Sequence, residues 1–215
     1  MWYPGAAAPK YLDGKLAGDF GFDPLRLGAN ENLLPYYQEA ELMNGRYAML
    51  GCLGALLSEA LFDFNWWEAG AQDYGFSIGQ LVAVQVPVMA FLEAKRIEGW
   101  QKTGGAGVLN TFPFDPLGYY KGKESNEAEI QNGRLAMVAF LGMCSAAANR
   151  GAGPIECLRQ HVADPGNVTA FTSDVGLELT VAVVMLSLAP FFVLAKQSLG
   201  DGEEENFSPI PFDFN

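Results

Sequence analysis

One polar motif occurs twice in the chain and combines residue types that could bind a metal. It reads E-x-x-N-G-R and begins at Glu41 and again at Glu129. Its asparagines, Asn44 and Asn132, follow these glutamates by three residues, which places both side chains on the same face of a helix. Carboxylate and amide oxygens at that spacing suit a hard cation such as magnesium. The alternative is that neighbouring backbone groups satisfy each amide.

The motif belongs to a longer internal repeat, which predicts how the two copies are arranged. Residues 39–60 align without gaps on residues 127–148, with 11 of 22 positions identical, and F-D-P-L precedes each copy, at 22–25 and at 114–117. A single apolar stretch separates the copies, so we expect two parallel helices related by an approximate two-fold axis. Small residues would let the backbones cross closely; these are Gly45, Ala48, Gly133 and Ala136.

The arginines of the motif predict ion pairs between the two copies. Glu41 and Arg46 are five residues apart, or about 140° around a helix, which is poor geometry for a pair within one helix. The two-fold relation favours Glu41 with Arg134 and Glu129 with Arg46. Such pairing offsets the cost of charges in an apolar layer. A carboxylate paired in this way can still offer its second oxygen to a metal.

The composition and the missing motifs argue against several classes of protein. Half of the 215 residues are hydrophobic, 18% are charged and the net charge is −12, which argues against nucleic acid as a partner. The common hydrolase and nucleotide-binding signatures are missing, so an ordinary enzyme is not expected. The three cysteines have neither disulfide-framework nor zinc-site spacing.

Uncharged stretches of 12 to 17 residues predict an all-α integral membrane protein, although each falls short of the roughly 20 residues of a span. Helices of spanning length result only when the motif's charged residues are included. The predicted segments are three spans at 39–62, 76–99 and 127–149, a candidate fourth at 175–197 and an acidic tail at 198–215. A soluble helical protein, or a transporter with a polar pathway, would also fit this pattern.

Taken together, these residues resemble the light-harvesting chlorophyll-binding antenna superfamily of plastids. The likeness covers roughly residues 2–168 and includes Y-L-D-G-K-L-A-G-D-F-G-F-D-P-L-R-L-G before the first motif. It implies a single pigment-binding domain with three thylakoid-spanning helices, of which the first and third cross. It also implies an N-terminal stromal segment (1–38) and a short lumenal amphipathic helix (154–163).

The resemblance also implies specific ligands for chlorophyll magnesium. On the crossed helices these are Glu41, Asn44, Glu129 and Asn132; the position of Asn44 is histidine in many members and asparagine in some photosystem I antennae, where it is associated with red-shifted absorption. On the middle helix, Q-V-P-V-M-A-F-L-E-A-K-R resembles the family pattern.

In that middle pattern Gln85 is a direct or water-mediated ligand, Glu93 is a ligand and Arg96 is its ion-pair partner. Their eight-residue spacing puts Gln85 and Glu93 on one face, although a polar seam between helices would look the same. His161 resembles the ligand on the amphipathic helix.

Two loops of the chain resemble the superfamily, and two other features differ from its usual pattern. G-F-D-P with Asp23 and P-F-D-P with Asp115 resemble the caps for carotenoid end groups, although Asp-Pro also marks ordinary turns. Many members carry a glutamine ligand where this chain has Ala146. The hydrophobic stretch after residue 174 lies beyond the usual three-helix pattern.

The expected function is that of an antenna subunit that passes excitation to a photosystem, with photosystem I favoured. Its expected cofactors are chlorophyll a, chlorophyll b or c and at least two carotenoids, with structural lipid as a further candidate. Its expected partners are the photosystem core, neighbouring antenna subunits and thylakoid lipid. The alternatives are a photoprotective member that dissipates energy, a pigment-free membrane transporter, and a soluble structural protein.

Overall fold

The computed structural model describes residues 8–23, 26–30, 32–62, 64–104, 115–169 and 172, together with 181, 182, 185 and 188. All regular structure within these residues is helical. In chain order the elements are η1 (Leu27–Ala29), α1 (Leu34–Phe62), η2 (Trp66–Ala71), α2 (Ile78–Thr103), α3 (Lys123–Arg150) and α4 (Pro154–Ala163).

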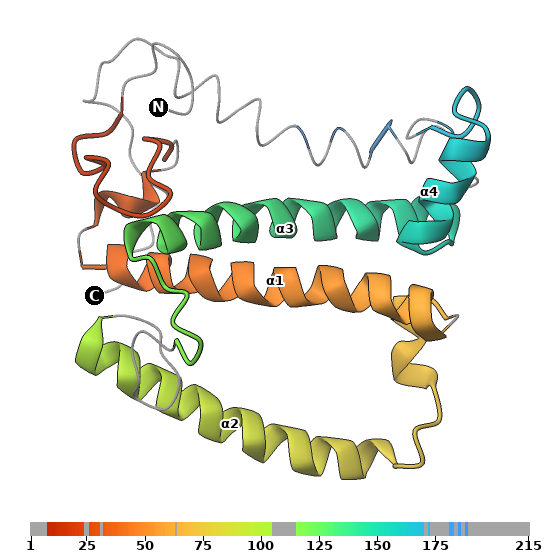
Figure 1. The fold of residues 1–215 in the computed structure, drawn as a ribbon, viewed down its shortest axis with the longest axis horizontal. Coiled ribbons are helices and arrows are strands. Elements are labelled where there is room, and N and C mark those ends of the chain that lie inside the picture. The colour runs from red at the N-terminus through yellow and green to blue at the C-terminus, as the bar shows by residue number, and fades with distance from the viewer. Residues whose placement is uncertain are drawn as a thin grey trace.

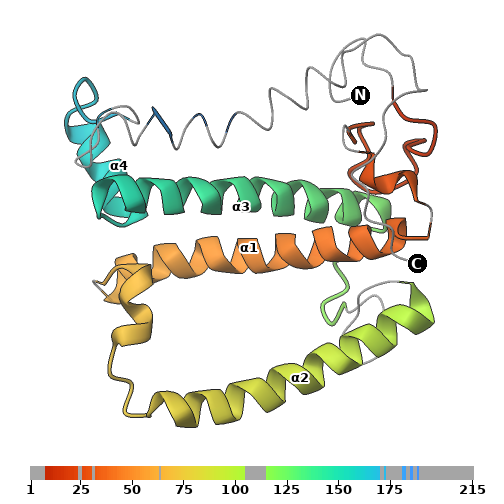
Figure 2. The same cartoon turned by 180° about the vertical axis from the view of Figure 1, so that it is seen from behind.

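The two copies of the repeat form the long helices α1 and α3, which lie side by side and run in the same direction (Figures 1 and 2). α2 runs the opposite way and is set apart from this pair (Figure 1). The short helix α4 follows α3 and packs against the ends of both α1 and α3. The expected parallel arrangement of the repeats is therefore present.

The backbones of α1 and α3 come into contact at the glycine of each motif. A Cβ atom added to Gly45 would lie 2.9 Å from Cα of Gly133, and one added to Gly133 would lie 3.0 Å from Cα of Gly45. Both glycines are buried, as are Ala136 and, further along α1, Ala55. Backbone meets backbone here, so any side chain larger than hydrogen would push the helices apart.

The three long helices are longer than the predicted segments, although α2 begins at Ile78 rather than at residue 76. α1 begins at Leu34 rather than at residue 39, because Pro35 in its first turn has a fixed φ suited to a helix start and lacks only an N–H that would have no partner there. α2 ends at Thr103 rather than at residue 99. The next residue, Gly104, ends the helix because it takes a left-handed conformation with φ +70°. α3 covers Lys123–Arg150 instead of 127–149, and α4 has the predicted bounds.

Large apolar side chains are exposed along all three long helices. They include Leu50 and Leu61 on α1, Val84 and Val86 on α2, and Leu135 and Val138 on α3. By length and composition, α2 alone among the described helices could cross a membrane by itself, and none of its apolar window is buried. α3 and α4 meet the same criterion only as one span bent by 68°.

The predicted C-terminal segments are not testable against this fold. The candidate fourth span at 175–197 lies outside the described residues except for 181, 182, 185 and 188, which are helical. The acidic tail at 198–215 lies wholly outside them.

The crossing predicts opposite effects for two similar substitutions on α1. Gly45→Ala should destabilise the folded protein by about 1–3 kcal/mol, because its methyl group overlaps the backbone of α3. Gly54→Ala should be neutral or stabilising by up to about 1 kcal/mol, because no atom lies within 4 Å of the added methyl group and alanine favours a helix. Thermal loss of the far-ultraviolet circular dichroism signal in one detergent measures both. Equal melting temperatures would contradict the close crossing.

Candidate functional site

Two equivalent ion pairs join α1 and α3 on either side of the glycine contact. Nε of Arg46 lies 2.6 Å from Oε1 of Glu129, and Nε of Arg134 lies 2.7 Å from Oε1 of Glu41. The structure thus brings together both cross-helix pairs that the sequence predicts. All four side chains are about one-third exposed. Because each of these bonds uses Oε1, it leaves the second carboxylate oxygen free to bind another group.

The two asparagines of the motif have the same geometry in both copies. Nδ2 of Asn44 donates to the carbonyl oxygen of Ala40, and Nδ2 of Asn132 donates to that of Ala128, each at 2.8 Å. Since a carbonyl can only accept, the amide nitrogen must face it. Both side chains are exposed, so each amide presents Oδ1 away from its helix. The backbone therefore satisfies only the nitrogen end of each amide.

Arg96 links the middle helix to α1. Its guanidinium lies 2.7 Å from Oε2 of Glu93, the predicted partner, and also contacts the carboxylate of Glu39. Glu39 is nearly buried, and sequence reasoning gave it no role, although it opens the repeat. Gln85 is exposed on α2, two turns before Glu93.

His161 lies near the C-terminal end of α4 with one ring nitrogen already engaged. Its Nδ1 lies 2.5 Å from the carbonyl oxygen of Val168. That oxygen can only accept, so Nδ1 carries a proton, and in the neutral ring the lone pair is on Nε2. The ring is exposed. A histidine held in this tautomer by a backbone carbonyl is suitably arranged to bind a metal through Nε2.

The two Asp-Pro loops use their aspartates as acceptors for local backbone groups. Asp23 accepts from the N–H groups of Leu27 at 3.1 Å and Gly28 at 2.7 Å, and from the hydroxyl of Tyr11 at 3.0 Å. Burial is the main cause that raises the pKa of Tyr11 well above its usual value, and the hydrogen bond to Asp23 raises this pKa further.

The second loop is built in the same way. Asp115 accepts from the N–H groups of Tyr119 at 2.9 Å and Tyr120 at 2.7 Å. The backbone hydrogen bond from Tyr120 is the main cause that lowers the pKa of Asp115. Both aspartates thus stabilise their turns. No described contact assigns either of them to a bound group.

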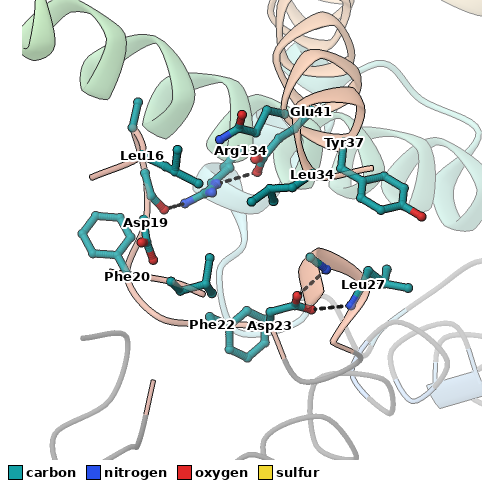
Figure 3. A pocket seen from close by; sticks show the side chains of 15 residues that line it. Leu16, Asp19, Phe20, Phe22, Asp23, Leu27, Leu34, Tyr37, Glu41 and Arg134 are labelled. Atoms are coloured by element: carbon teal, nitrogen blue, oxygen red, sulfur yellow. Dashed lines mark hydrogen bonds and ion pairs between the residues drawn. The ribbon is translucent and has the colours of Figure 1, made fainter. Parts of the chain in front are cut away.

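An open pocket of about 850 Å³ lies between the segment that precedes α1, here residues 12–23 and 27–28, and the helices α1 and α3 (Figure 3). Apolar side chains such as Leu16 and Phe20 line it, and the Glu41–Arg134 pair forms part of its wall. The segment is tied to α3 through Gly18, whose N–H donates to Glu127 at 3.0 Å and whose carbonyl accepts from Arg134 at 2.6 Å. One carboxylate of the motif therefore borders a largely apolar space.

Sequence reasoning missed a further contact at the other end of the molecule. Glu59, near the end of α1, accepts from the backbone N–H groups of Ile155 and Glu156 in α4, each at 2.7 Å. The sequence contains one sign of this contact. The two copies of the repeat differ at this position, because Glu59 aligns with Ala147 in the second copy.

Comparison with known proteins identifies the family. A family model described as "Chlorophyll A-B binding protein" matches residues 8–148. The chain is 34% identical over 200 residues to "Photosystem I chlorophyll a/b-binding protein 6, chloroplastic" of Arabidopsis thaliana, covering 80% of this chain and 74% of the relative. It is 36% identical over 203 residues to "Chlorophyll a-b binding protein, chloroplastic" of Petunia hybrida, with the same coverage. It is 40% identical over 188 residues to "Chlorophyll a-b binding protein 6, chloroplastic" of Arabidopsis thaliana, covering 76% and 75%. The chain belongs to the chlorophyll A-B binding protein family.

Proposed function

We propose that this chain is a light-harvesting antenna subunit that holds chlorophylls at defined positions and passes their excitation energy to a photosystem. The observation that carries the proposal is the repeated arrangement on α1 and α3. In each copy a carboxylate is paired through one oxygen with an arginine of the other helix, and an outward-facing amide oxygen lies one turn later.

The donor groups fit a metal that takes a single ligand from the protein. Within the described part of the chain, no group of three or more His, Cys, Asp or Glu side chains could hold a metal ion. Magnesium in a chlorophyll ring already has four nitrogen ligands and needs one more. We assign this ligand to an oxygen of Glu41, Glu129, Asn44 or Asn132 at the respective positions, because hard oxygen donors suit magnesium.

The arginines make these carboxylates tolerable in an apolar setting. An unpaired carboxylate is costly in a lipid layer, whereas Arg134 and Arg46 offset the charges of Glu41 and Glu129. We assign the same division of roles to α2, where Arg96 pairs with Glu93 and Gln85 provides a second ligand, direct or through water. His161 supplies Nε2 on α4.

We further propose that α1, α2 and α3 each cross the thylakoid membrane. α2 is long and apolar enough to cross by itself. For α1 and α3 the support is the exposure of large apolar side chains and their lengths of 29 and 28 residues, about 40 Å at ~1.5 Å per residue. The charged groups of the motif (Glu41, Arg46, Glu129 and Arg134) are paired between α1 and α3 and need not face lipid unpaired.

The remaining assignments follow from the same proposal. Chlorophyll a, with chlorophyll b or c, would occupy the ligand positions, and at least two carotenoids would lie in the grooves of the crossing, with end groups near Asp23 and Asp115. Lipid is a further candidate ligand. The photosystem I relative supports photosystem I and its neighbouring antenna subunits as partners, in the thylakoid membrane of the plastid.

The proposal predicts that the native protein is pigmented. The chain, purified from its membranes in mild detergent, should absorb in the red and blue bands of chlorophyll, and excitation of an accessory pigment should produce chlorophyll a fluorescence. Absorption and fluorescence excitation spectra test this directly. A folded protein without colour would refute the antenna assignment.

The ion pairs predict different effects for two ligand substitutions on α3. Glu129→Gln keeps an oxygen donor but leaves Arg46 without its counter-charge, so the yield of pigmented complex should fall roughly tenfold, the equivalent of about 1.4 kcal/mol. Asn132→Gln keeps both ion pairs, so its yield should stay close to that of the wild type while one chlorophyll is lost. Reconstitution with purified pigments and pigment analysis measure both quantities.

A charge exchange serves as the control for this experiment. Glu129→Arg combined with Arg46→Glu restores opposite charges across the crossing, so part of the yield should return. Equal yields for Glu129→Gln and Asn132→Gln would count against the cross-helix pairing.

A further inference from the structure

We infer that Glu59 is the positioning residue of the His161 site: its carboxylate, at the end of α1, fixes the N-terminus of α4 and thereby the place of the imidazole. The inference rests on the proposed function, in which His161 binds a chlorophyll. Glu59 itself is not offered as a ligand, because both of its oxygens are already used.

The carboxylate satisfies the free donors at the start of α4. Ile155 donates its N–H to Oε2 and Glu156 donates its N–H to Oε1, both at 2.7 Å. Pro154 at the first position has no N–H, and the N–H of Cys157 is already bonded to the carbonyl of Gly153 at 2.9 Å. A helix of ten residues thus begins with all its donors satisfied, two of them by one side chain of another helix. The negative charge at a helix N-terminus is also favourable.

The chain leaves space for this contact at one position. A Cβ atom added to Gly153 would lie 2.5 Å from Oε2 and 2.6 Å from Cδ of Glu59. Gly153 is buried, and its φ of −68° is open to any residue. The need for glycine there is therefore one of space for the carboxylate rather than of backbone conformation.

The C-terminal end of α4 is held by a separate set of contacts. Val168, whose carbonyl orients His161, donates its own N–H to the carbonyl of Asp164 at 2.9 Å. Arg150, the last residue of α3, donates to the carbonyl of Thr169 at 2.7 Å. The imidazole is thus oriented locally, but its distance from α1 depends on where α4 is docked. Among the described residues, Glu59 is the charged side chain of α1 that hydrogen-bonds to α4.

The experiment compares substitutions in the full-length chain after reconstitution with chlorophylls a and b and a thylakoid carotenoid mixture. His161→Ala should lose one chlorophyll and give a defined negative band in the absorption difference spectrum. Glu59→Gln has one acceptor oxygen instead of two and presents an N–H₂ group to a donor, so it should lose the same chlorophyll with the same difference band. The double variant should lose no more than either single variant.

Two further variants test the geometry. Gly153→Ala keeps the carboxylate but blocks its approach, so it should reproduce the loss seen with Glu59→Gln. Arg159→Gln is the matched control on the same helix, because its side chain is exposed and its ion pair in the described part of the chain lies along α4, with Glu156. It should keep the wild-type pigment content and spectrum.

The possible failures are distinguishable. A wild-type chain that takes up no chlorophyll would refute the proposed function. A pigmented wild type, with Glu59→Gln keeping the chlorophyll that His161→Ala loses, would overturn this inference alone. Complete failure of Glu59→Gln to form a pigmented complex would also overturn it, since the carboxylate would then support the whole assembly rather than one site.

Discussion

The close crossing of α1 and α3 is the constraint on which the rest of the structure depends. Gly45 and Gly133 meet with no room for a methyl group, and one ion pair lies on each side of that contact. The arrangement is reciprocal, because each helix supplies one carboxylate and one guanidinium. A rotation or slide of either helix would break both pairs together, and each unpaired charge would carry a high cost in an apolar layer.

The crossing explains how one short motif can have a structural and a binding role. The glycine permits the approach, the arginine binds one oxygen of the opposing carboxylate, and the asparagine turns its amide oxygen outward through a bond to its own helix. In the proposed function these contacts therefore orient the ligand side chains before any pigment binds. Pigment positions would then follow from helix geometry, which is what defined distances and orientations for energy transfer require.

The symmetry of the repeat ends at the two ends of the molecule. At one end Arg134 also binds the carbonyl of Gly18, so the N-terminal segment closes over one of the two carboxylates and forms the pocket beside Glu41. At the other end Glu59 docks α4, and the second copy has Ala147 at that position. The pocket gives Glu41 surroundings that its counterpart Glu129 does not share, which would give pigments bound at the two carboxylates different environments.

The sequence alone was sufficient to predict the repeat, its parallel copies and the cross-helix pairs, because these follow from residue spacing, symmetry and the cost of unpaired charge. The Glu93–Arg96 pair was predicted from the resemblance to the family. Tertiary structure was needed for Glu59, Glu39 and Gly18, whose partners lie 57 to 116 residues away in the chain. No periodicity encodes such contacts, because they depend on how the helix ends and loops come to lie beside one another. The tautomer of His161 was likewise decided by the folded chain, which places the carbonyl oxygen of Val168 beside the ring. The direction of each asparagine amide is set more locally, by the carbonyl oxygen four residues earlier in its own helix.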